Sequence, residues 1–268
     1  MTRDLGLDLG LEGRVAIVTG ASRGIGRAVA TALAERGVQL VLGARDPLPL
    51  ETVIDELTTS GANAVGLAVD VCDPASSSLL RDTALERFGR IDIIVNNAGG
   101  GGSRLEEFDE DEWLALYRLN VTSAVRLVMA CLESMRARGY GRIVNIASTM
   151  ARHVDPRFGP YGAAKAALVH ASRNLSLAYA REGILTNCVL VGLTRTDGVQ
   201  HRLEQLAHER STDPDEIARR MMQRQPIAMG RLGEPAEVAA AVVFLCSQQA
   251  AWITGADLLV DGGTITDL

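Results

Sequence analysis

Short apolar, β-branched runs alternate with longer amphipathic stretches along almost the whole chain, and this pattern limits the possible folds most strongly. The apolar runs span 15–19, 39–43, 64–70, 91–96, 141–148, 185–191 and 257–261. The stretches between them predict helices near 24–36, 48–60, 74–88, 109–138, 158–181 and 235–247. Continuously apolar strands separated by helices are typical of a parallel sheet that is covered on both faces. The predicted fold class is therefore α/β, a doubly wound parallel sheet of about seven strands with helices on both faces.

A single domain is predicted over 12–268, after a short N-terminal extension at 1–11, because no repeat or flexible linker marks a boundary. The segment 192–233 differs from the rest in being polar and helical. Within it, TDPDE (212–216) combines an N-cap residue with a proline at a helix start. The segment follows the sixth strand, so it is expected to lie over the carboxyl edge of the sheet, where ligands bind in such folds. We predict that it is a small helical lid.

Charge and composition exclude several classes of protein. A net charge of −6 argues against nucleic acid or an anionic membrane as the main partner. No stretch approaches the roughly 18 apolar residues of a membrane span, and the N-terminal MTRDLGLDLGLEGR is charged where a signal peptide is apolar. A cytoplasmic location is therefore expected. The four cysteines and four histidines show no metal-ligand spacing, so no metal site is predicted.

A glycine-rich turn, VTGASRGIGRAV (18–29), joins the first strand to the first helix. Its glycines at 20, 24 and 26 allow a tight turn, close approach of a pyrophosphate, and close packing of helix on strand. A phosphate at the start of the helix would meet free N–H groups and the positive end of the helix dipole. We interpret the turn as a dinucleotide site; the alternative is a turn with a purely structural role.

The end of the second strand, VLGARDP (41–47), bears on the choice of dinucleotide. An acidic residue there would bind the ribose hydroxyls of NAD, whereas a basic residue favours the 2′-phosphate of NADP. This chain has Ala44 followed by Arg45, and Arg23 in the glycine turn is expected to reach the same phosphate. We expect Asp46 to point away as the chain turns. The cofactor predicted is NADPH; the alternative for each arginine is a solvated surface residue.

Two further segments carry chemistry. NNAGGGGSR (96–104) ends the fourth strand, and its glycines leave room for a flat ring system against the chain, unless it is an ordinary flexible loop. PYGAAKAAL (160–168) places Tyr161 and Lys165 on one face of a helix. A phenol titrates near about pH 10 unless a nearby positive charge lowers its pKa. We interpret the pair as a tuned acid; the alternative is a surface tyrosine along a lysine stem.

Together these motifs resemble those of the short-chain dehydrogenase/reductase family, in particular its branch of single-domain enzymes that includes 3-oxoacyl-(acyl carrier protein) reductases. The resemblance covers roughly 12–263 and rests on seven features in order: TGASRGIG, DV at 70–71, NNAG, LN at 119–120, the serine at 148, YGAAK, and ITGADLLVDGG. It implies a Rossmann fold and hydride transfer between a nicotinamide dinucleotide and a substrate. The family commonly forms tetramers, so a homotetramer is predicted.

The resemblance implies four catalytic residues. Tyr161 would protonate the substrate carbonyl oxygen, and Lys165 would lower the Tyr161 pKa and bind the nicotinamide ribose. Ser148 would hydrogen-bond the carbonyl oxygen as charge develops there. Asn120, in the helix predicted at 109–138, would hold a water molecule that connects Lys165 to solvent.

The resemblance also implies the cofactor-binding residues, which include Tyr161 and Lys165. Asp70 is expected at the adenine and Asn97 near the adenosine ribose. After the sixth strand the family usually has Pro-Gly, whereas this chain has Val191-Gly192, which makes the turn less rigid. The other implied cofactor-binding residues are Gly20, Ser22, Arg23, Gly24, Ile25, Gly26, Arg45, Val71, Ala98, Gly99, Gly192, Thr194 and Thr196.

The substrate side is expected to include Ser148, His153, Phe158 and Tyr161. Arginines at 104, 152, 157, 195 and 202 indicate an anionic or phosphopantetheine-carried substrate, or are solvated loop residues. The function predicted is NADPH-dependent reduction of a 3-oxoacyl or related ketone, as a small molecule or on a carrier. The alternatives are a dehydrogenase that oxidises a secondary alcohol and a nucleotide-binding regulatory protein without turnover.

Overall fold

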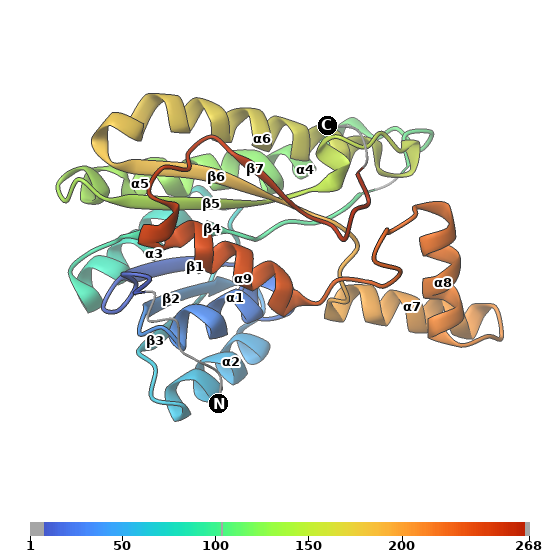
Figure 1. Ribbon diagram of the computed structural model, residues 1–268, viewed down its shortest axis with the longest axis horizontal. Coiled ribbons are helices and arrows are strands. Elements are labelled where there is room, and N and C mark those ends of the chain that lie inside the picture. Colours follow the sequence, from blue (N-terminus) through green and yellow to red (C-terminus); the bar gives the residue numbers. More distant parts are fainter. Residues whose placement is uncertain (1–7, 103, 266–268) are drawn as a thin grey trace.

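Seven parallel strands form one sheet in the order β3-β2-β1-β4-β5-β6-β7 in the computed structural model, which describes residues 8–102 and 104–265 (Figure 1). Residues 1–7 of the predicted extension lie outside the described residues. The order reverses between β1 and β4, and crevices for ligands open at such a point. The doubly wound sheet is confirmed. Its strands are β1 (Val15–Thr19), β2 (Gln39–Ala44), β3 (Ala64–Ala68), β4 (Ile93–Asn96), β5 (Gly141–Ser148), β6 (Ile184–Val191) and β7 (Asp257–Val260).

Helices cover both faces of the sheet, which explains why the strands are continuously apolar. Successive strand residues point to opposite faces, so Val18 packs in the cluster with α1, α2 and α9, and Ile17 packs in the cluster with α3, α5 and α6. Both side chains are fully buried. The helices are α1 (Gly24–Ala34), α2 (Pro47–Thr59), α3 (Pro74–Phe88), α4 (Glu110–Tyr117), α5 (Ser123–Arg136), α6 (Gly159–Tyr179), α7 (Asp197–Glu209), α8 (Pro214–Arg224) and α9 (Pro235–Cys246). Short 3-10 turns occupy Thr149–Ala151, Pro156–Phe158, Ala180–Glu182 and Gln248–Ala250.

Several helices begin at side-chain caps followed by proline. Asp73 accepts a hydrogen bond from the Ala75 N–H at 2.9 Å, and α3 then begins at Pro74. Asp213 accepts one from the Glu216 N–H at 2.8 Å, so α8 begins within the predicted TDPDE signal. Such caps satisfy N–H groups that have no partner within the helix, and this is why these starts are visible in the sequence.

The helix predicted at 109–138 is not regular throughout. A π-helical turn at Arg118–Thr122 separates α4 from α5, and turns of this kind occur frequently at functional sites. By length and mean hydropathy, Glu110–Arg136 is long and apolar enough to cross a membrane, contrary to the expectation that no stretch approaches this. Leu127, Val128 and Cys131 on this helix pack into the core against the sheet.

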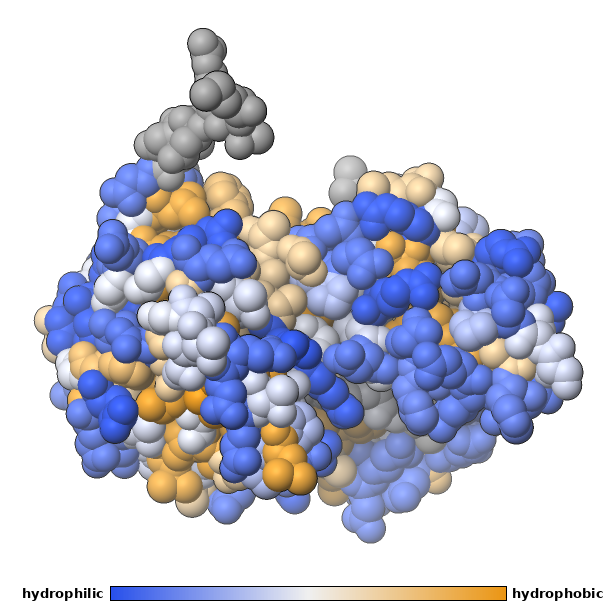
Figure 2. Space-filling model, turned by 90° about the horizontal axis from the view of Figure 1, so that it is seen from below, coloured by the Kyte–Doolittle hydropathy of each residue, from blue (hydrophilic) through white to orange (hydrophobic). Residues whose placement is uncertain are grey.

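The helices α7 and α8 form a unit of their own beyond the carboxyl ends of the strands, at the right of Figure 1. Their apolar faces meet in a small cluster that includes Leu203, Ala207, Ile217 and Ala218, and Met221 and Met222 pack against it. Figure 2 shows mainly hydrophilic side chains on the outside of this unit. The helical segment predicted after the sixth strand is therefore present, while its role as a lid stays a prediction.

Candidate active site

Two elements, β5 and α6, bring three of the predicted catalytic residues together. Ser148 is the last residue of β5, and Tyr161 and Lys165 lie in the first two turns of α6. The Lys165 Nζ atom is 5.7 Å from the centre of the Tyr161 ring. Tyr161 also shares a hydrogen bond with Ser148. A hydroxyl, a phenol and an amine thus form one polar cluster at the carboxyl edge of the sheet.

Lys165 is a buried amine with an altered proton affinity. Its side chain is 4% exposed, and its Nζ donates a hydrogen bond to the Ile146 carbonyl at 2.8 Å. Burial disfavours the ammonium and lowers the pKa of Lys165 to about 8. Lys165 is also the only lysine among the 27 basic residues of the chain. An arginine would stay charged in such surroundings, so of the two long basic side chains only a lysine can release its proton here.

The structure contradicts one expectation about Tyr161. Burial raises the pKa of its phenol above the ordinary value, and the hydrogen bond with Ser148 acts in the opposite direction. The expected lowering by Lys165 is wrong for this structure, because Lys165 is itself buried and its Nζ donates to Ile146. The phenol therefore keeps its proton at neutral pH, which is the state a proton donor needs.

Asn120 lies in the π-helical turn and is 2% exposed. Its Nδ2 donates to the carbonyls of Leu116, at 3.0 Å, and Gly100, at 3.2 Å, while its Oδ1 accepts from the Gly100 N–H at 3.4 Å. A Cβ atom on Gly99 would come within 2.8 Å of Asn120 Oδ1 and 3.1 Å of Lys165 Nζ. The glycine loop after β4 therefore lies against both side chains.

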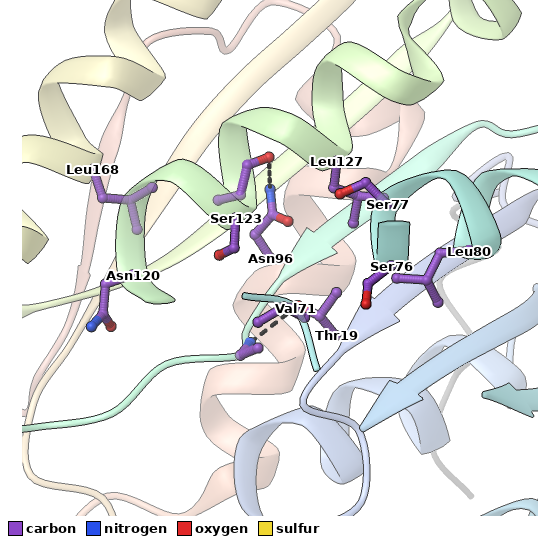
Figure 3. Close-up of a pocket in the computed structure, with 12 residues that line it drawn as sticks. Thr19, Val71, Ser76, Ser77, Leu80, Asn96, Asn120, Ser123, Leu127 and Leu168 are labelled. Carbon is purple, nitrogen blue, oxygen red and sulfur yellow. Dashed lines mark hydrogen bonds between the residues drawn. The ribbon is translucent and has the colours of Figure 1, made fainter. Parts of the chain in front are cut away.

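A small polar cavity of about 10 Å³ lies beside Asn120 (Figure 3). Its walls come from β1, α3, β4 and α5, and they include Thr19, Ser76, Asn96 and Ser123. Figure 3 shows the Asn96 amide donating to a main-chain carbonyl, which is that of Ala124 at 3.5 Å. A cavity of this size and polarity suits one water molecule.

A cleft of about 620 Å³ opens where the strand order reverses and contains most of the predicted cofactor-binding residues. This volume is typical of small-molecule and cofactor sites. The predicted residues that line it are Gly20, Ser22, Arg23, Gly24, Ile25, Arg45, Val71, Asn97, Ala98, Gly99 and Thr196. Asn97 also stabilises the glycine turn, because its Nδ2 donates to the carbonyls of Thr19 and Gly20 at 2.9 and 3.0 Å.

The glycine turn fits a dinucleotide pyrophosphate. Gly20 and Gly24 have φ of +65° and +55°, which side-chain-bearing residues rarely adopt. A Cβ on Gly26 would overlap the Gly20 carbonyl oxygen and lie 2.5 Å from Asn97 Nδ2, so Gly26 supports the turn from beneath rather than lining the cleft. α1 begins at Gly24, and its first N–H groups form an anion-binding helix terminus.

Charges of both signs line the adenosine end of the cleft. Arg23 and Arg45 are exposed there, and across the described residues neither guanidinium has an ion pair or hydrogen bond. Asp46 was expected to point away, but it also lines the cleft. The reason is local: Asp46 is the N-cap of α2 and accepts from the Leu48 N–H at 3.3 Å, which keeps the residue at the strand end.

Some implied cofactor residues lie outside this cleft. Asp70 is exposed beside the lining residue Val71, and its carboxylate accepts from the Cys72 N–H at 2.9 Å. Gly192 and Thr194 line a separate hollow of about 500 Å³, together with residues before α9 and after β7. The Thr194 hydroxyl donates to the Gly192 carbonyl at 3.2 Å, so this hydroxyl already has a partner. Tyr161 and Lys165 line neither space.

The structure does not bring His153 and Phe158 to the polar cluster. Both line another hollow, of about 210 Å³, against the outer side of the first turns of α6, and neither Ser148 nor Tyr161 lines it. Several arginines proposed for an anionic substrate are paired with carboxylates. Arg152 binds Asp257, Arg157 binds Asp155, and Arg195 lies within 4.0 Å of Asp215 and Glu234.

Comparisons with known proteins agree with this geometry. The sequence model of a family described as Enoyl-(Acyl carrier protein) reductase matches residues 20–265. The 3-oxoacyl-[acyl-carrier-protein] reductase of Escherichia coli (strain K12) is 37% identical over 256 residues, which are 95% of this chain and 98% of that protein. The chain belongs to the short-chain dehydrogenase/reductase family. As a member of this family it is an oxidoreductase, and the resemblance found in its motifs is confirmed.

Two solved members of the short-chain dehydrogenase/reductase family share its fold closely. The L-sorbose reductase of Gluconobacter frateurii, in complex with NADPH and L-sorbose, has a TM-score of 0.94 at 33% identity, over 98% of this chain and 100% of its own. A 7α-hydroxysteroid dehydrogenase, in complex with NADH and 7-oxo glycochenodeoxycholic acid, has a TM-score of 0.85 at 33% identity, over 96% of both chains. Proteins similar to this chain thus bind either dinucleotide.

Several residues of the 620 Å³ cleft were not predicted from the sequence. Leu119 belongs to the LN motif but was given no role, Val69 precedes the DV motif, and Pro49 lies in the first turn of α2. Asp197 and Gly198 come from the start of α7. The threonine at 196 followed by an acidic residue is a helix-start signal, but it does not tell which other helix that start will face.

Proposed function

We propose that this short-chain dehydrogenase/reductase is an NADPH-dependent reductase that converts a 3-oxoacyl or related ketone to a secondary alcohol. The observation that carries the proposal is the Ser148, Tyr161 and Lys165 cluster, in which the phenol keeps its proton at neutral pH. The cluster lies next to Gly99, and Gly99 lines the dinucleotide cleft. A proton donor beside a dinucleotide site is what carbonyl reduction requires.

The residues of this chain would act on the carbonyl oxygen and on its proton. When bound, a reduced nicotinamide supplies the hydride that adds to the carbonyl carbon. Tyr161 then gives its proton to the carbonyl oxygen, and the Ser148 hydroxyl donates a hydrogen bond to the same oxygen. Lys165, with a pKa of about 8, restores the Tyr161 proton by exchange through a water molecule held at Asn120.

The preference proposed for NADPH rests on charge. Arg23 and Arg45 place two guanidinium groups in the cleft, and neither has a partner among the described residues. The two carboxylates of the cleft already accept hydrogen bonds, Asp46 from the start of α2 and Asp197 from Gly24. A guanidinium binds a phosphate through two parallel hydrogen bonds. The L-sorbose reductase structure with NADPH supports this choice, and the 7α-hydroxysteroid dehydrogenase structure with NADH shows the alternative within similar chains.

The substrate class rests on the relatives. The 3-oxoacyl-[acyl-carrier-protein] reductase supports a 3-oxoacyl group, free or on a carrier, and L-sorbose reductase and the hydroxysteroid dehydrogenase support other ketones. Oxidation of a secondary alcohol is the alternative direction. The proposal includes a cytoplasmic homotetramer, which the exposed side chains of Leu177 and Trp252, 83% and 99% exposed, support as surfaces for a second copy.

The proposed chemistry is tested by Tyr161→Phe, which removes the proton donor and keeps the ring. General acid catalysis contributes about 10²–10⁴-fold, so turnover of a panel of ketones should fall at least about a hundredfold while the dissociation constant for NADPH changes little. Activity is followed as NADPH oxidation. A variant that keeps more than about a tenth of wild-type turnover rules out Tyr161 as the acid.

The cofactor preference is tested with both dinucleotides on the same ketone. Hydrogen bonds to charged groups are worth about 1.5–3 kcal/mol, so kcat/KM should favour NADPH by at least about tenfold at low salt and by less as salt is added. Arg45→Gln together with Ala44→Asp should reverse the preference. Equal use of NADPH and NADH by the wild type at low salt shows that neither arginine binds the 2′-phosphate.

A further inference from the structure

The start of α7 reaches back to the glycine turn. Asp197, the first residue of α7, accepts a hydrogen bond from the Gly24 N–H through Oδ2 at 2.8 Å. Gly24 is the first residue of α1, so its N–H has no partner within the helix. It is one of the donors to which a pyrophosphate would bind. Thr196 contacts the same place, since a Cβ on Gly24 would lie 3.3 Å from the Thr196 side chain. The start of α7 and the start of α1, 173 residues apart in the sequence, are therefore joined through the Gly24 N–H.

The Asp197 carboxylate that accepts from the Gly24 N–H is an anion, as a pyrophosphate is. The Asp197 carboxylate lies in the first turn of α7 and on the first N–H of α1, so it meets the positive ends of two helix dipoles. Asp197 is exposed, and its bond to Gly24 competes with water and is easily exchanged. A second anion at the same donor is repelled by the carboxylate.

The other carboxylate of the cleft does not share this position. Asp46 accepts from Leu48 at the start of α2, next to Arg45 at the adenosine end. Asp197 is therefore the carboxylate that competes at α1. It also joins the cofactor cleft to the helical unit of α7 and α8, because breaking its bond to Gly24 removes a contact between that unit and the glycine turn.

We propose that Asp197 is an internal anion that occupies the pyrophosphate position of the glycine turn, holds α7 on α1 before cofactor binds, and is displaced by the dinucleotide. The proposal rests on the proposed function, because it needs a dinucleotide in this cleft. Its consequence is that cofactor binding releases the start of α7 from the glycine turn. Because Asp197 competes with the pyrophosphate, the wild type binds the cofactor more weakly than a chain without this carboxylate would.

The test compares Asp197→Asn, which keeps the shape and removes the charge, with Glu204→Gln as the matched control. Glu204 is an exposed carboxylate on the same helix that bonds to Gln200 and does not line the cleft. Repulsion between two unit charges about 4 Å apart in water weakens binding roughly fivefold. Asp197→Asn should therefore bind NADPH at least about fivefold more tightly than the wild type does. Glu204→Gln should bind NADPH as the wild type does.

Adenosine 2′-monophosphate, which has no pyrophosphate, serves as the second ligand. Its affinity should be the same for wild type and Asp197→Asn, since the carboxylate lies at α1 and not at the adenosine end. Equal or weaker NADPH binding by Asp197→Asn overturns the proposal, as does an equal gain for both ligands. A wild type that binds no NADPH contradicts the proposed function instead, so the two failures are distinguishable.

A measurement without cofactor tests the contact itself. Asp197→Ala removes the acceptor, so backbone amides in α7 should exchange hydrogen with solvent faster than in the wild type, while those of α9 should not change. Saturating NADPH should bring the α7 amides of the wild type to the rate of the variant. Unchanged α7 exchange in Asp197→Ala shows that the carboxylate does not hold this helix.

Discussion

Lys165 is held as a buried amine, and the structure allows the size of this effect on stability to be worked out. Burial lowers the pKa of Lys165 from 10.5 to about 8 in the folded chain. Each pKa unit is worth about 1.36 kcal/mol, so the charged side chain destabilises the folded state at neutral pH by about 3 kcal/mol. Lys165→Met removes this cost but leaves the Ile146 carbonyl without its donor, which costs about 1 kcal/mol.

The sign follows from proton binding. Between about pH 8 and pH 10.5 the unfolded chain holds a proton on Lys165 that the folded chain releases, so stability rises with pH in this window. Below about pH 8 the buried Lys165 destabilises the folded chain by the full amount, and above about pH 10.5 this destabilisation is gone. At pH 7, Lys165→Met should therefore be about 2 kcal/mol more stable than wild type, which raises the melting temperature by about 4–8 °C. The advantage should disappear at about pH 10, where the remaining cost of the charged Lys165 equals the loss at Ile146, and the variant should be the less stable protein above that pH.

Two measurements check this, both without cofactor and at one protein concentration. Because the chain has one lysine, a ¹³C-lysine label gives a single Cε signal whose titration reports the pKa of Lys165 directly. Thermal unfolding across pH gives the stability difference. Lys165→Arg is the control, since it stays charged at every pH and should be less stable than wild type. A Lys165 signal that titrates at pH 10 or above, or a Met variant less stable than wild type at pH 7, refutes the reasoning.

Two further predictions concern the glycine turn and the assembly. Gly26→Ala should lower the melting temperature by several degrees and weaken NADPH binding. The added Cβ meets the Gly20 carbonyl, which belongs to the backbone and cannot move aside. Unchanged NADPH binding in a titration would show that the turn is not tight. Light scattering at micromolar concentration should give the mass of four chains of 28.5 kDa, and Leu177→Glu should reduce it; a monomer in the wild type would show that no such assembly forms.

Patterns within a few residues decided much of the fold. The seven apolar runs became the seven strands within two residues at each end, because burial on both faces demands continuous apolar side chains. The start of α8 at Pro214 was visible because a cap and a proline act within one turn. Tyr161 and Lys165 share a helix face because their spacing of four residues alone dictates it. The position of the glycine turn between β1 and α1 was likewise local.

Contacts between distant segments were decided only in the tertiary structure. The hydrogen bond of Asp197 to Gly24, the opposite shift of the Tyr161 pKa, and the separate hollow around His153 and Phe158 all depend on how segments pack. A pKa in particular depends on the burial of the group and on the direction of its neighbours, and spacing along a helix determines neither. Local periodicity follows from backbone geometry, so the sequence by itself determined the elements and their order. Which side chains meet across the cleft is the outcome of many weak packing contacts at once, and only the folded chain specifies it.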